Sequence, residues 1–319
     1  MNILILGGAG FIGSNLVRRC LADRSNKVTV VDSLDQRLKS TREHLKAVSA
    51  DIEFIQGDTR DAALMQEVVV GKEVIFNCAA QTSHPLSLTD PLYDAQVNCL
   101  GSLTVLESVR NRNPKALVVY TSSSTVIGKS QGDIVDESHG ERPLDIYSAN
   151  KGVVEKYHWI YHHVHGLKTL SIRFANLFGP YGKGYPEFGF INYFIALARQ
   201  DKEIKIFGEG LQQRNVMYVQ DAVDLLYGCV SHPHIFGDIY FAAHREHYSV
   251  TQIAAEIVSV FGQGKIVHVP WPDLRKKIEI DNVVISSAKF NRAVDFKPRY
   301  NLREGLVRTK EIFEKEAVS

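Results

Sequence analysis

Short apolar runs alternate with longer amphipathic stretches through the first half of the chain. Five runs have the length and composition of strands buried in a parallel sheet: residues 2–6, 27–31, 52–56, 74–78 and 116–120. Stretches with apolar positions at helical spacing separate them: residues 11–21, 41–48, 62–70 and 94–109. Parallel strands need such crossovers, so the alternation predicts an α/β fold with a doubly wound parallel sheet.

The alternation continues through a helix at residues 145–165 and a strand at 168–175, and the pattern changes after Gly179. Beyond this point the expected helices and strands cover residues 190–200, 204–207, 238–243, 249–261 and 265–269, followed by a mostly helical C-terminus. Gly208–Gly210 is expected to form a hairpin turn, and Ser249 to cap a helix. We therefore expect a boundary near residue 178 and a smaller mixed α/β lobe at residues 179–319, with some of its segments packed back on the first lobe.

The turn after the first apolar run is rich in glycine. Gly7, Gly10 and Gly13 follow one another at three-residue spacing, between a strand and a helix. The glycines allow a tight turn and close approach of the backbone to phosphate, and the helix N-terminus presents free N–H groups. The next strand ends in Asp32, where an acidic residue would hold a ribose. This order of features predicts a dinucleotide site in a Rossmann fold.

Two further strand ends carry residues suited to a cofactor. Asp58 and Thr59 follow the third strand, and Ala79, Ala80 and Gln81 follow the fourth. Ligands of doubly wound sheets collect at the carboxyl ends of strands. Asp58 could therefore accept a hydrogen bond from an adenine amino group, and the small residues after the fourth strand would leave room for a flat cofactor.

Composition narrows the class of protein. The 319 residues carry a net charge of +1 without a basic or acidic block, so we expect no nucleic acid and no membrane as a partner. The four cysteines lack metal-ligand spacing, and we expect no metal. No targeting segment precedes the first strand and no apolar run reaches the length of a membrane span, which leads us to expect a cytoplasmic protein.

Tyr147 and Lys151 are spaced i and i+4 on an expected helix and therefore share one helix face. A free tyrosine has a pKa of about 10, too high for a base near neutrality, and a nearby ammonium favours the phenolate. Ser123, at the end of the fifth strand, can share a substrate oxygen with this phenol. Together the three residues would remove a proton from a hydroxyl while hydride leaves the adjacent carbon.

These motifs resemble those of the extended short-chain dehydrogenase/reductases, specifically the NAD-dependent nucleotide-sugar epimerase/dehydratase group. The matching segments run in the family's order over nearly the whole chain: Gly7–Gly13, Gly57–Asp58, Asn77–Ala80, Val97–Asn98, Ser122–Val126, Tyr147–Lys151, Arg173–Asn176, Gly179–Gly182 and Gly208–Asp221. The resemblance implies an enzyme with a Rossmann NAD-binding domain at residues 1–178 and a nucleotide-sugar-binding lobe at residues 179–319.

The resemblance also implies roles for individual residues, with Ser123, Tyr147 and Lys151 as the catalytic set. The residues expected at NAD are Gly7, Gly10, Phe11, Ile12, Gly13, Asp32, Asp58, Thr59, Ala79, Ala80, Gln81, Asn98, Tyr147 and Lys151. The residues expected at the nucleotide sugar are His84, Ser123, Ser124, Asn176, Arg214 and Arg275. The fork of an arginine suits the diphosphate of such a substrate.

The residues after Ser123 bear on the reaction. Family 4,6-dehydratases carry Asp-Glu there, and family decarboxylases carry a glutamate at the second position, whereas this chain has Ser124 and Thr125. The difference favours a reaction similar to that of UDP-glucose 4-epimerase, in which C4 is oxidised, the 4-ketose rotates and hydride returns to the other face. NAD would then stay bound, and a UDP-hexose is the favoured substrate. Ile127 stands where the family has tyrosine, which leaves the epimerase subgroup open.

Two other functions remain as alternatives. One is a different NAD-dependent reaction of a nucleotide sugar, such as 2-epimerisation, 3,5-epimerisation or dehydration, with Glu187 or His84 as the acid or base. The other is a regulator that binds NAD without catalysis, which the presence of Ser123, Tyr147 and Lys151 disfavours.

One helix carries several histidines, and His158 and His162 have the spacing of metal ligands. No carboxylate accompanies them in the order that zinc enzymes use, so we expect contact with solvent or a second subunit instead. The helices expected at residues 94–109 and 147–165 resemble the pair through which family members dimerise, which implies a homodimer.

Overall fold

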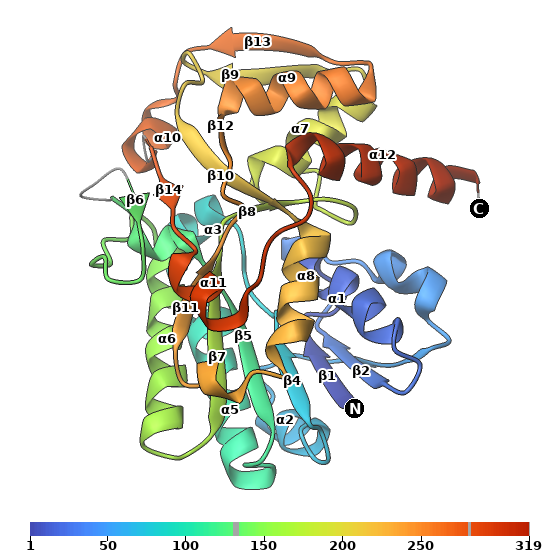
Figure 1. Cartoon of the computed structure of the whole chain (residues 1–319), viewed down its shortest axis with the longest axis vertical. Coiled ribbons are helices and arrows are strands. Elements are labelled where there is room, and N and C mark those ends of the chain that lie inside the picture. The colour runs from blue at the N-terminus through green and yellow to red at the C-terminus, as the bar shows by residue number, and fades with distance from the viewer. Residues whose placement is uncertain (130–133, 280–281, 319) are drawn as a thin grey trace. The chain divides into compact units, whose positions relative to one another are not determined.

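The chain folds into two compact units, each assembled from separate stretches of sequence (Figure 1). The computed structural model describes residues 1–129, 134–279 and 282–318. The first unit comprises Met1–Val126, Asp145–Arg173 and Val223–Tyr240, and the second comprises Ile127–Leu144, Phe174–Ala222 and Phe241–Ser319. The chain passes from one unit to the other at several positions. One of these positions, Arg173–Phe174, lies close to the boundary that the sequence suggests near residue 178.

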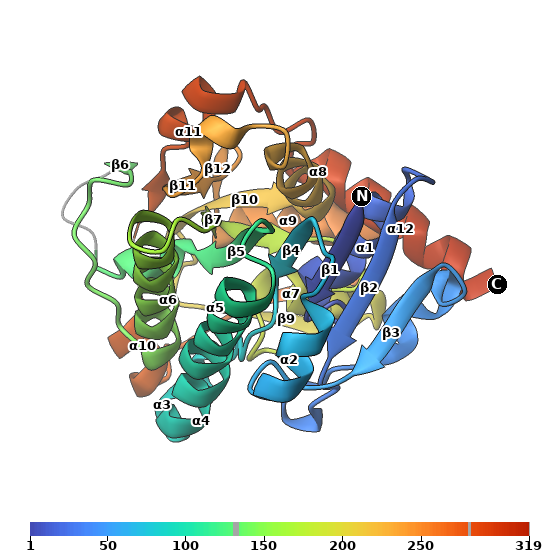
Figure 2. The ribbon, with the colours of Figure 1, turned by 90° about the horizontal axis from the view of Figure 1, so that it is seen from below.

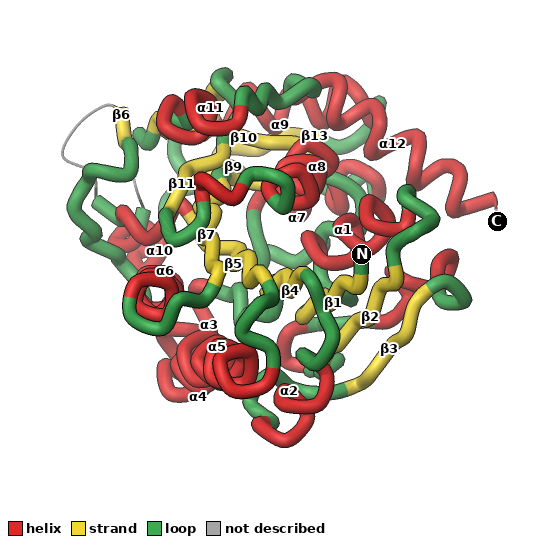
Figure 3. Tube along the Cα trace, turned by 60° about the horizontal axis from the view of Figure 1, so that its bottom comes forward, coloured by secondary structure: helices red, strands yellow, loops and turns green. Residues whose placement is uncertain are grey.

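The central sheet has seven strands in the order β11-β7-β5-β4-β1-β2-β3 (Figure 3). They are β1 (Asn2–Leu6), β2 (Lys27–Asp32), β3 (Ile52–Gln56), β4 (Val74–Asn77), β5 (Leu117–Ser123), β7 (Lys168–Phe174) and β11 (Ile239–Ala242). The pairings of β1 with β2 and β4, of β2 with β3 and of β4 with β5 are parallel. The order runs outward from β1 in both directions, which confirms the doubly wound sheet and places its switch point between β1 and β4.

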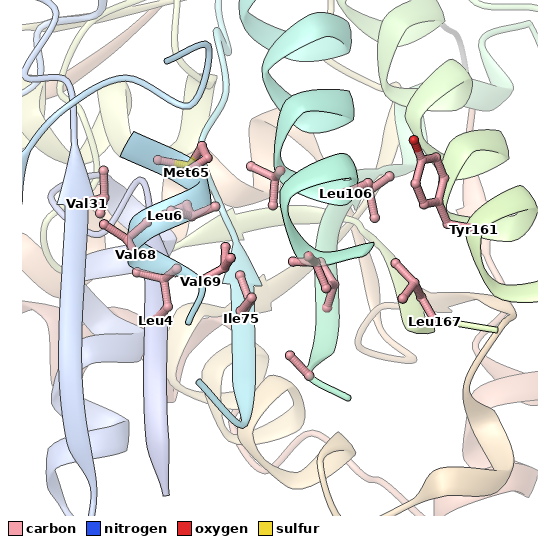
Figure 4. Packing of buried hydrophobic residues seen from close by; sticks show 14 residues of the cluster. Leu4, Leu6, Val31, Met65, Val68, Val69, Ile75, Leu106, Tyr161 and Leu167 are labelled. Carbon is pink, nitrogen blue, oxygen red and sulfur yellow. The ribbon is translucent and has the colours of Figure 1, made fainter. Parts of the chain in front are cut away.

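Helices cover both faces of this sheet. The helices α2 (Ala62–Val68), α5 (Gly101–Arg112) and α6 (Ile146–His163) lie along one face, and α1 (Phe11–Leu21) lies along the other (Figure 2). Met65 of α2, Leu106 of α5 and Tyr161 of α6 belong to one buried cluster (Figure 4). Strand residues such as Leu4 and Ile75 belong to the same cluster. Because both faces are covered, the strands are apolar almost throughout, which is the pattern seen in the sequence.

The helix expected at residues 94–109 has an interruption. After the short helix α3 (His84–Thr89), α4 (Pro91–Ala95) leads into a π turn at Gln96–Leu100, and α5 follows. The helical run begins earlier than expected because proline suits a first turn and Asp90 accepts a hydrogen bond from the backbone N–H of Tyr93. Residues Arg42–Val48 also differ from expectation, since they form a 3₁₀ helix.

The described part of the second unit contains three small sheets: β8 (Asn176–Phe178) with β10 (Gln213–Tyr218) and β12 (His247–Ser249), β9 (Glu203–Phe207) with β13 (Lys265–Val269), and β6 (Ile134–Val135) with β14 (Val284–Ile285). The remaining helices are α7 (Phe190–Arg199), α8 (Val219–Cys229), α9 (Val250–Phe261), α10 (Asp273–Ile278), α11 (Ala288–Val294) and α12 (Leu302–Val318). Ser249 caps α9 in a capping box with Gln252, as expected. Across residues 1–129, 134–279 and 282–318, no helix is both long and apolar enough to cross a bilayer.

The hairpin expected at Gly208–Gly210 is wrong. Both glycines have positive φ angles, of 63° and 66°, so the chain does turn here. However, β9 pairs in parallel with β13, whereas β10 pairs with β8 and β12. The turn therefore redirects the chain from one sheet to another, a choice that depends on pairing partners distant in sequence.

Candidate active site

The three evenly spaced glycines of the turn between β1 and α1, Gly7, Gly10 and Gly13, differ in the room they leave for a side chain. Gly7 has a φ of 74°, and a Cβ there would lie 2.7 Å from the backbone of Ala79. A Cβ on Gly13 would overlap the carbonyl oxygen of Gly7. By contrast, a Cβ added to Gly10 would lie 3.2 Å from the carbonyl oxygen of Gly7, and no other atom of the described residues outside its chain neighbours would lie within 4 Å of it. Packing thus requires Gly7 and Gly13, whereas Gly10 leaves a side of the turn open, as a phosphate cradle needs.

Asp32 connects this turn to the end of β2. Its Oδ2 accepts a hydrogen bond from the backbone of Ala9 at 3.0 Å, and its Oδ1 accepts one from Leu34 at 2.9 Å. Each carboxylate oxygen has a second lone pair, so Asp32 can still accept a hydrogen bond from a ribose hydroxyl. The buried carboxylate is thereby held in a fixed position beside the start of α1, where Phe11 and Ile12 lie.

Asp58 and Thr59 follow β3, and the structure shows partners for both. The guanidinium of Arg60 donates to both oxygens of Asp58, at 2.9 and 2.7 Å, and this contact is the largest cause of the lowered pKa of Asp58. Thr59 is buried against Gly101 at the start of α5. Asp58 therefore meets any adenine as part of an ion pair, and Thr59 supports the adjoining helix.

Tyr93, a residue that sequence reasoning missed, lies beside the loop after β2. Its hydroxyl donates to Asp35 at 2.7 Å, and the guanidinium carbon of Arg37 lies 3.6 Å from the centre of its ring. Local sequence contains no signal for this cluster, because α4 and the loop after β2 meet through the fold. The stacked Arg37 guanidinium and Tyr93 ring thus form a cation–π pair near Asp32, the last residue of β2.

Asn98 lies on the π turn, within a buried set of amides around Asp94. The carboxylate of Asp94 accepts hydrogen bonds from the side chains of Gln81 at 2.6 Å, Asn98 at 3.0 Å and Asn150 at 2.7 Å. Asn98 and the backbone of Gln81 also bond in both directions, at 3.1 and 3.0 Å. The Ala79–Gln81 loop is thereby fixed against the π turn. Sequence reasoning missed Asp94, since its importance depends on three partners from different segments.

Ser123, Tyr147 and Lys151 are brought together by β5 and α6. The hydroxyl of Ser123 bonds with the Tyr147 phenol and with Thr125 Oγ1, the latter at 2.8 Å, and Ser148 donates to Thr125 at 2.9 Å. Lys151 Nζ donates to the carbonyl of Thr121 at 2.9 Å and lies 5.8 Å from the centre of the Tyr147 ring. A chain of hydroxyls thus leads to the phenol, and Ser124 begins the 3₁₀ turn beside it.

The electrostatic balance at Tyr147 differs from the sequence expectation. Burial is the largest cause and raises the pKa of Tyr147; the charges of Asp145 and Asp94 raise it further, and the hydrogen bond of Ser123 lowers it. Burial also lowers the pKa of Lys151 from 10.5 to about 8. The spacing alone suggests that Lys151 lowers the pKa of Tyr147, but in the structure burial and the two carboxylates raise this pKa, and the charge of Lys151 is not among the causes of the shift.

His84 lies next to Tyr147 and is oriented by Asp145. Its Nδ1 is 2.7 Å from Asp145 Oδ2, and the ring centres of His84 and Tyr147 are 4.7 Å apart in an edge-on arrangement. Burial would raise the pKa of Asp145, but the hydrogen bond and charge of His84, together with the hydrogen bonds of Ser148, outweigh burial and leave this pKa below its usual value. The sequence points to His84 but not to Asp145 as its partner, because 61 positions separate them.

The other residues expected at a nucleotide sugar belong to the second unit. Asn176 begins β8 and donates to the backbone of Asn215 at 3.0 Å. Arg214, on β10, forms an ion pair with Glu279, so a diphosphate would have to compete with this carboxylate. Arg275 belongs to α10, but its side chain lies outside the described residues.

The expected contact of His158 with solvent or a second subunit is wrong. His158 is buried, with its ring centre 5.1 Å from that of Tyr120, and burial lowers its pKa to about 3. The turn of α6 directs this position toward β5 rather than outward. His162 is partly buried and its Nδ1 lies 2.8 Å from the carbonyl of Leu167.

Comparison with known proteins agrees with this architecture. The model of the NAD dependent epimerase/dehydratase family matches residues 3–258. The UDP-glucose 4-epimerase of Mycolicibacterium smegmatis is 30% identical over 98% of both chains, and the dTDP-glucose 4,6-dehydratase of Streptomyces niveus is 28% identical over 98% of this chain and 92% of that one. The structure of UDP-glucose 4-epimerase with UDP-glucose from Thermotoga maritima is similar with a TM-score of 0.87, at 27% identity over 99% of this chain and 100% of that one.

The doubly wound sheet, the glycine cradle and the grouping of Ser123, Tyr147 and Lys151 are those of an extended short-chain dehydrogenase/reductase. The chain belongs to the NAD dependent epimerase/dehydratase family, and it is an enzyme of that family with NAD as its cofactor. Relatives with two different reactions match it at similar identity, so the family match alone does not choose between them.

Proposed function

We propose that the protein is a nucleotide-sugar 4-epimerase that acts on an NDP-hexose, with a UDP-hexose favoured. The observation that carries this proposal is the surroundings of Ser123. Ser124 and Thr125 stand where an acid would be needed to expel a hydroxyl, and Thr125 is part of a hydroxyl chain with Ser123 and Ser148. Relatives named as 4-epimerases support the same choice.

The chain's own residues would divide the work as follows. Tyr147 takes the proton of the C4 hydroxyl and returns it to the same oxygen after the sugar has rotated, and Ser123 holds that oxygen. Bound NAD would supply hydride chemistry at C4. Because burial opposes ionisation of Tyr147, positive charge close to the phenol is required, and Lys151 supplies part of it.

The second unit would hold the nucleotide part of the substrate through Asn176 and Arg214, and residues 1–178 would supply most of the NAD site. A diphosphate that engages Arg214 would displace Glu279, since both compete for the same guanidinium. Glu279→Gln is expected to lower the KM of the nucleotide sugar without a matching change in kcat.

We further propose that the protein is a cytoplasmic homodimer. Several large apolar side chains are exposed on α4, on the π turn and on α6 with its C-terminal end: Leu92, Leu100, Trp159, Ile160 and Val164. Their exposure supports self-association through these helices. All four cysteines are free thiols, which is consistent with a reducing compartment.

The reaction is tested by incubating the protein with UDP-, GDP-, CDP- and dTDP-hexoses in deuterated water, followed by mass spectrometry and sugar analysis. A new C4 epimer of unchanged mass is the expected result. Loss of water, or deuterium at a carbon next to C4, would show dehydration or an enolate mechanism and would refute the 4-epimerase proposal. Tyr147→Phe serves as the inactive control. If no nucleotide sugar reduced the NAD bound to the wild-type protein, the protein would instead be a non-catalytic NAD binder.

A further inference from the structure

The N-cap of α6 has a second partner besides its own helix. Asp145 Oδ1 accepts a hydrogen bond from the backbone of Ser148 at 2.8 Å, which caps the helix, while Oδ2 faces His84 Nδ1 at 2.7 Å. The side chain of Asp145 is 8% exposed and that of His84 is 33% exposed. Serine, threonine or asparagine would cap a helix as well as aspartate does, so the cap alone does not require a carboxylate at this position.

A carboxylate is unfavourable so close to the phenol that is expected to ionise. The charge of Asp145 is the largest cause after burial of the raised pKa of Tyr147. The hydrogen bond from His84 draws negative charge on Asp145 toward the imidazole, and the imidazole ring itself contacts Tyr147 edge-on at 4.7 Å. His84 is therefore placed where it can offset the effect of Asp145 on the phenol.

The other polar groups around Tyr147 come from three elements. Lys151 lies on α6, Ser123 and Tyr120 lie on β5, and Asp94 lies on α4. Asp94 is held by three neutral amides, which do not titrate. Of the two carboxylates that act on Tyr147, Asp145 is thus the one that bonds, within the described part of the chain, to an imidazole that also contacts the phenol ring.

We propose that His84 and Asp145 are positioning residues that set the basicity of Tyr147. The N–H of His84 that faces Asp145 offsets the repulsion between this carboxylate and the phenolate. The pair would make the phenolate available at lower pH than Asp145 alone would allow. The inference rests on the proposed role of Tyr147 as the base.

Three single variants separate this role from a structural one. His84→Leu keeps the charge of Asp145 but removes the group that offsets it, so the pKa of Tyr147 is expected to rise by about one unit. Asp145→Asn removes the charge and retains the helix cap, so the pKa is expected to fall by about one unit. His84→Gln keeps a neutral donor to Asp145, and its Tyr147 pKa is expected to lie between those of His84→Leu and the wild type.

The measurement is an ultraviolet titration of tyrosinate in the full-length protein with NAD bound. Each spectrum is compared with that of the same variant carrying Tyr147→Phe, which isolates the one phenol. Opposite shifts for His84→Leu and Asp145→Asn support the proposal, and the acid limb of the rate profile should move in the same two directions. Equal pKa values in all variants, or shifts in one direction, would overturn it.

No sugar enters the titration, so its outcome is separate from that of the proposed function. If Tyr147→Phe retained turnover, the assigned base would be wrong while the effect of the pair on the phenol would still be measured. If His84→Leu did not fold, the comparison of His84→Gln with Asp145→Asn would carry the same test, with a rise and a fall as the expected directions.

Discussion

At the scale of single residues, the evenly spaced glycines Gly7, Gly10 and Gly13 of the cradle meet different neighbours and so have different costs of substitution. Gly13 packs on the carbonyl of Gly7, and Gly7 packs on the backbone of Ala79 with a positive φ. Gly10 faces a more open side of the turn. Two of the glycines are therefore constrained by folding, and the third by the ligand that the turn accommodates.

Gly13→Ala is expected to destabilise the fold by several kcal/mol, because neither Gly7 nor the helix can move away from the added methyl group. Gly10→Ala is expected to fold almost normally but to bind NAD at least tenfold more weakly, which corresponds to about 1.4 kcal/mol. Denaturant unfolding and calorimetric titration with NAD measure the two effects. A Gly10→Ala protein with wild-type NAD affinity would show that the pyrophosphate does not approach Gly10.

Lys151 is expected to cost stability in the protein without NAD. Its pKa is about 8 when folded against 10.5 as the ordinary value, so the native state holds an unfavourable buried ammonium below pH 8. As the pH rises from about 8 to about 10.5, the native state loses this proton before the unfolded state does, and stability rises across that window.

Lys151→Met should therefore abolish turnover yet stabilise the NAD-free protein near neutrality. The expected gain is roughly 2 kcal/mol, which is the charge penalty less the value of the hydrogen bond to Thr121. Urea unfolding at a series of pH values should show the advantage of the variant shrinking as the pH approaches about 10. A difference that does not depend on pH would contradict the assignment of a desolvated ammonium.

At the scale of elements, the π turn between α4 and α5 determines where Asn98 lies. A π turn is less regular than an α-helix and is found where a side chain must be redirected, often at functional sites. Here the turn is held by the buried carboxylate of Asp94, which bonds three amides from different segments. The position of Asn98 beside the Ala79–Gln81 loop thus depends on one buried residue.

Asp94→Asn is expected to disrupt this arrangement, because the new amide presents donors where three donors already converge. We expect a loss of about 2 kcal/mol in the free energy of unfolding and at least tenfold weaker NAD binding. Asp90→Asn is the matched control, since asparagine can also cap α4, and it should change neither quantity appreciably. If both variants behaved alike, the role assigned to Asp94 would be wrong.

At the scale of the whole molecule, the expected homodimer depends on apolar side chains that the fold leaves at the surface. Leu100 follows α4 on the π turn and Trp159 lies on α6, and both are about half exposed. We expect the wild type to sediment as a dimer and the double variant Leu100→Asp, Trp159→Asp to sediment as a monomer, because two buried charges per subunit would oppose association. Leu211→Asp, at an exposed leucine of the second unit, is the control and should leave the assembly unchanged.

Much of the first unit is predictable from sequence for a physical reason. Strands buried on both faces are continuous apolar runs, and their crossovers show helical spacing, so fold class follows from local patterns. The cradle at Gly7, the strand-end Asp32 and the pair Tyr147 and Lys151 are also local, because each lies within one strand–turn–helix segment or one helical turn. Such features need no knowledge of distant partners.

The features that only the tertiary structure decides all involve segments distant in sequence. Pairing of β9 with β13 rather than β10 replaces the expected hairpin, and the direction of α6 buries His158 against Tyr120. Pairing of His84 with Asp145 likewise joins the starts of two helices that lie far apart in the sequence. By itself the sequence determines which elements form and which chemistry they carry, since those follow from periodicity and short motifs. The tertiary structure determines which groups meet, and hence how strongly Tyr147 and Lys151 are shifted from their ordinary pKa values, because burial and charge contacts arise only when the elements pack.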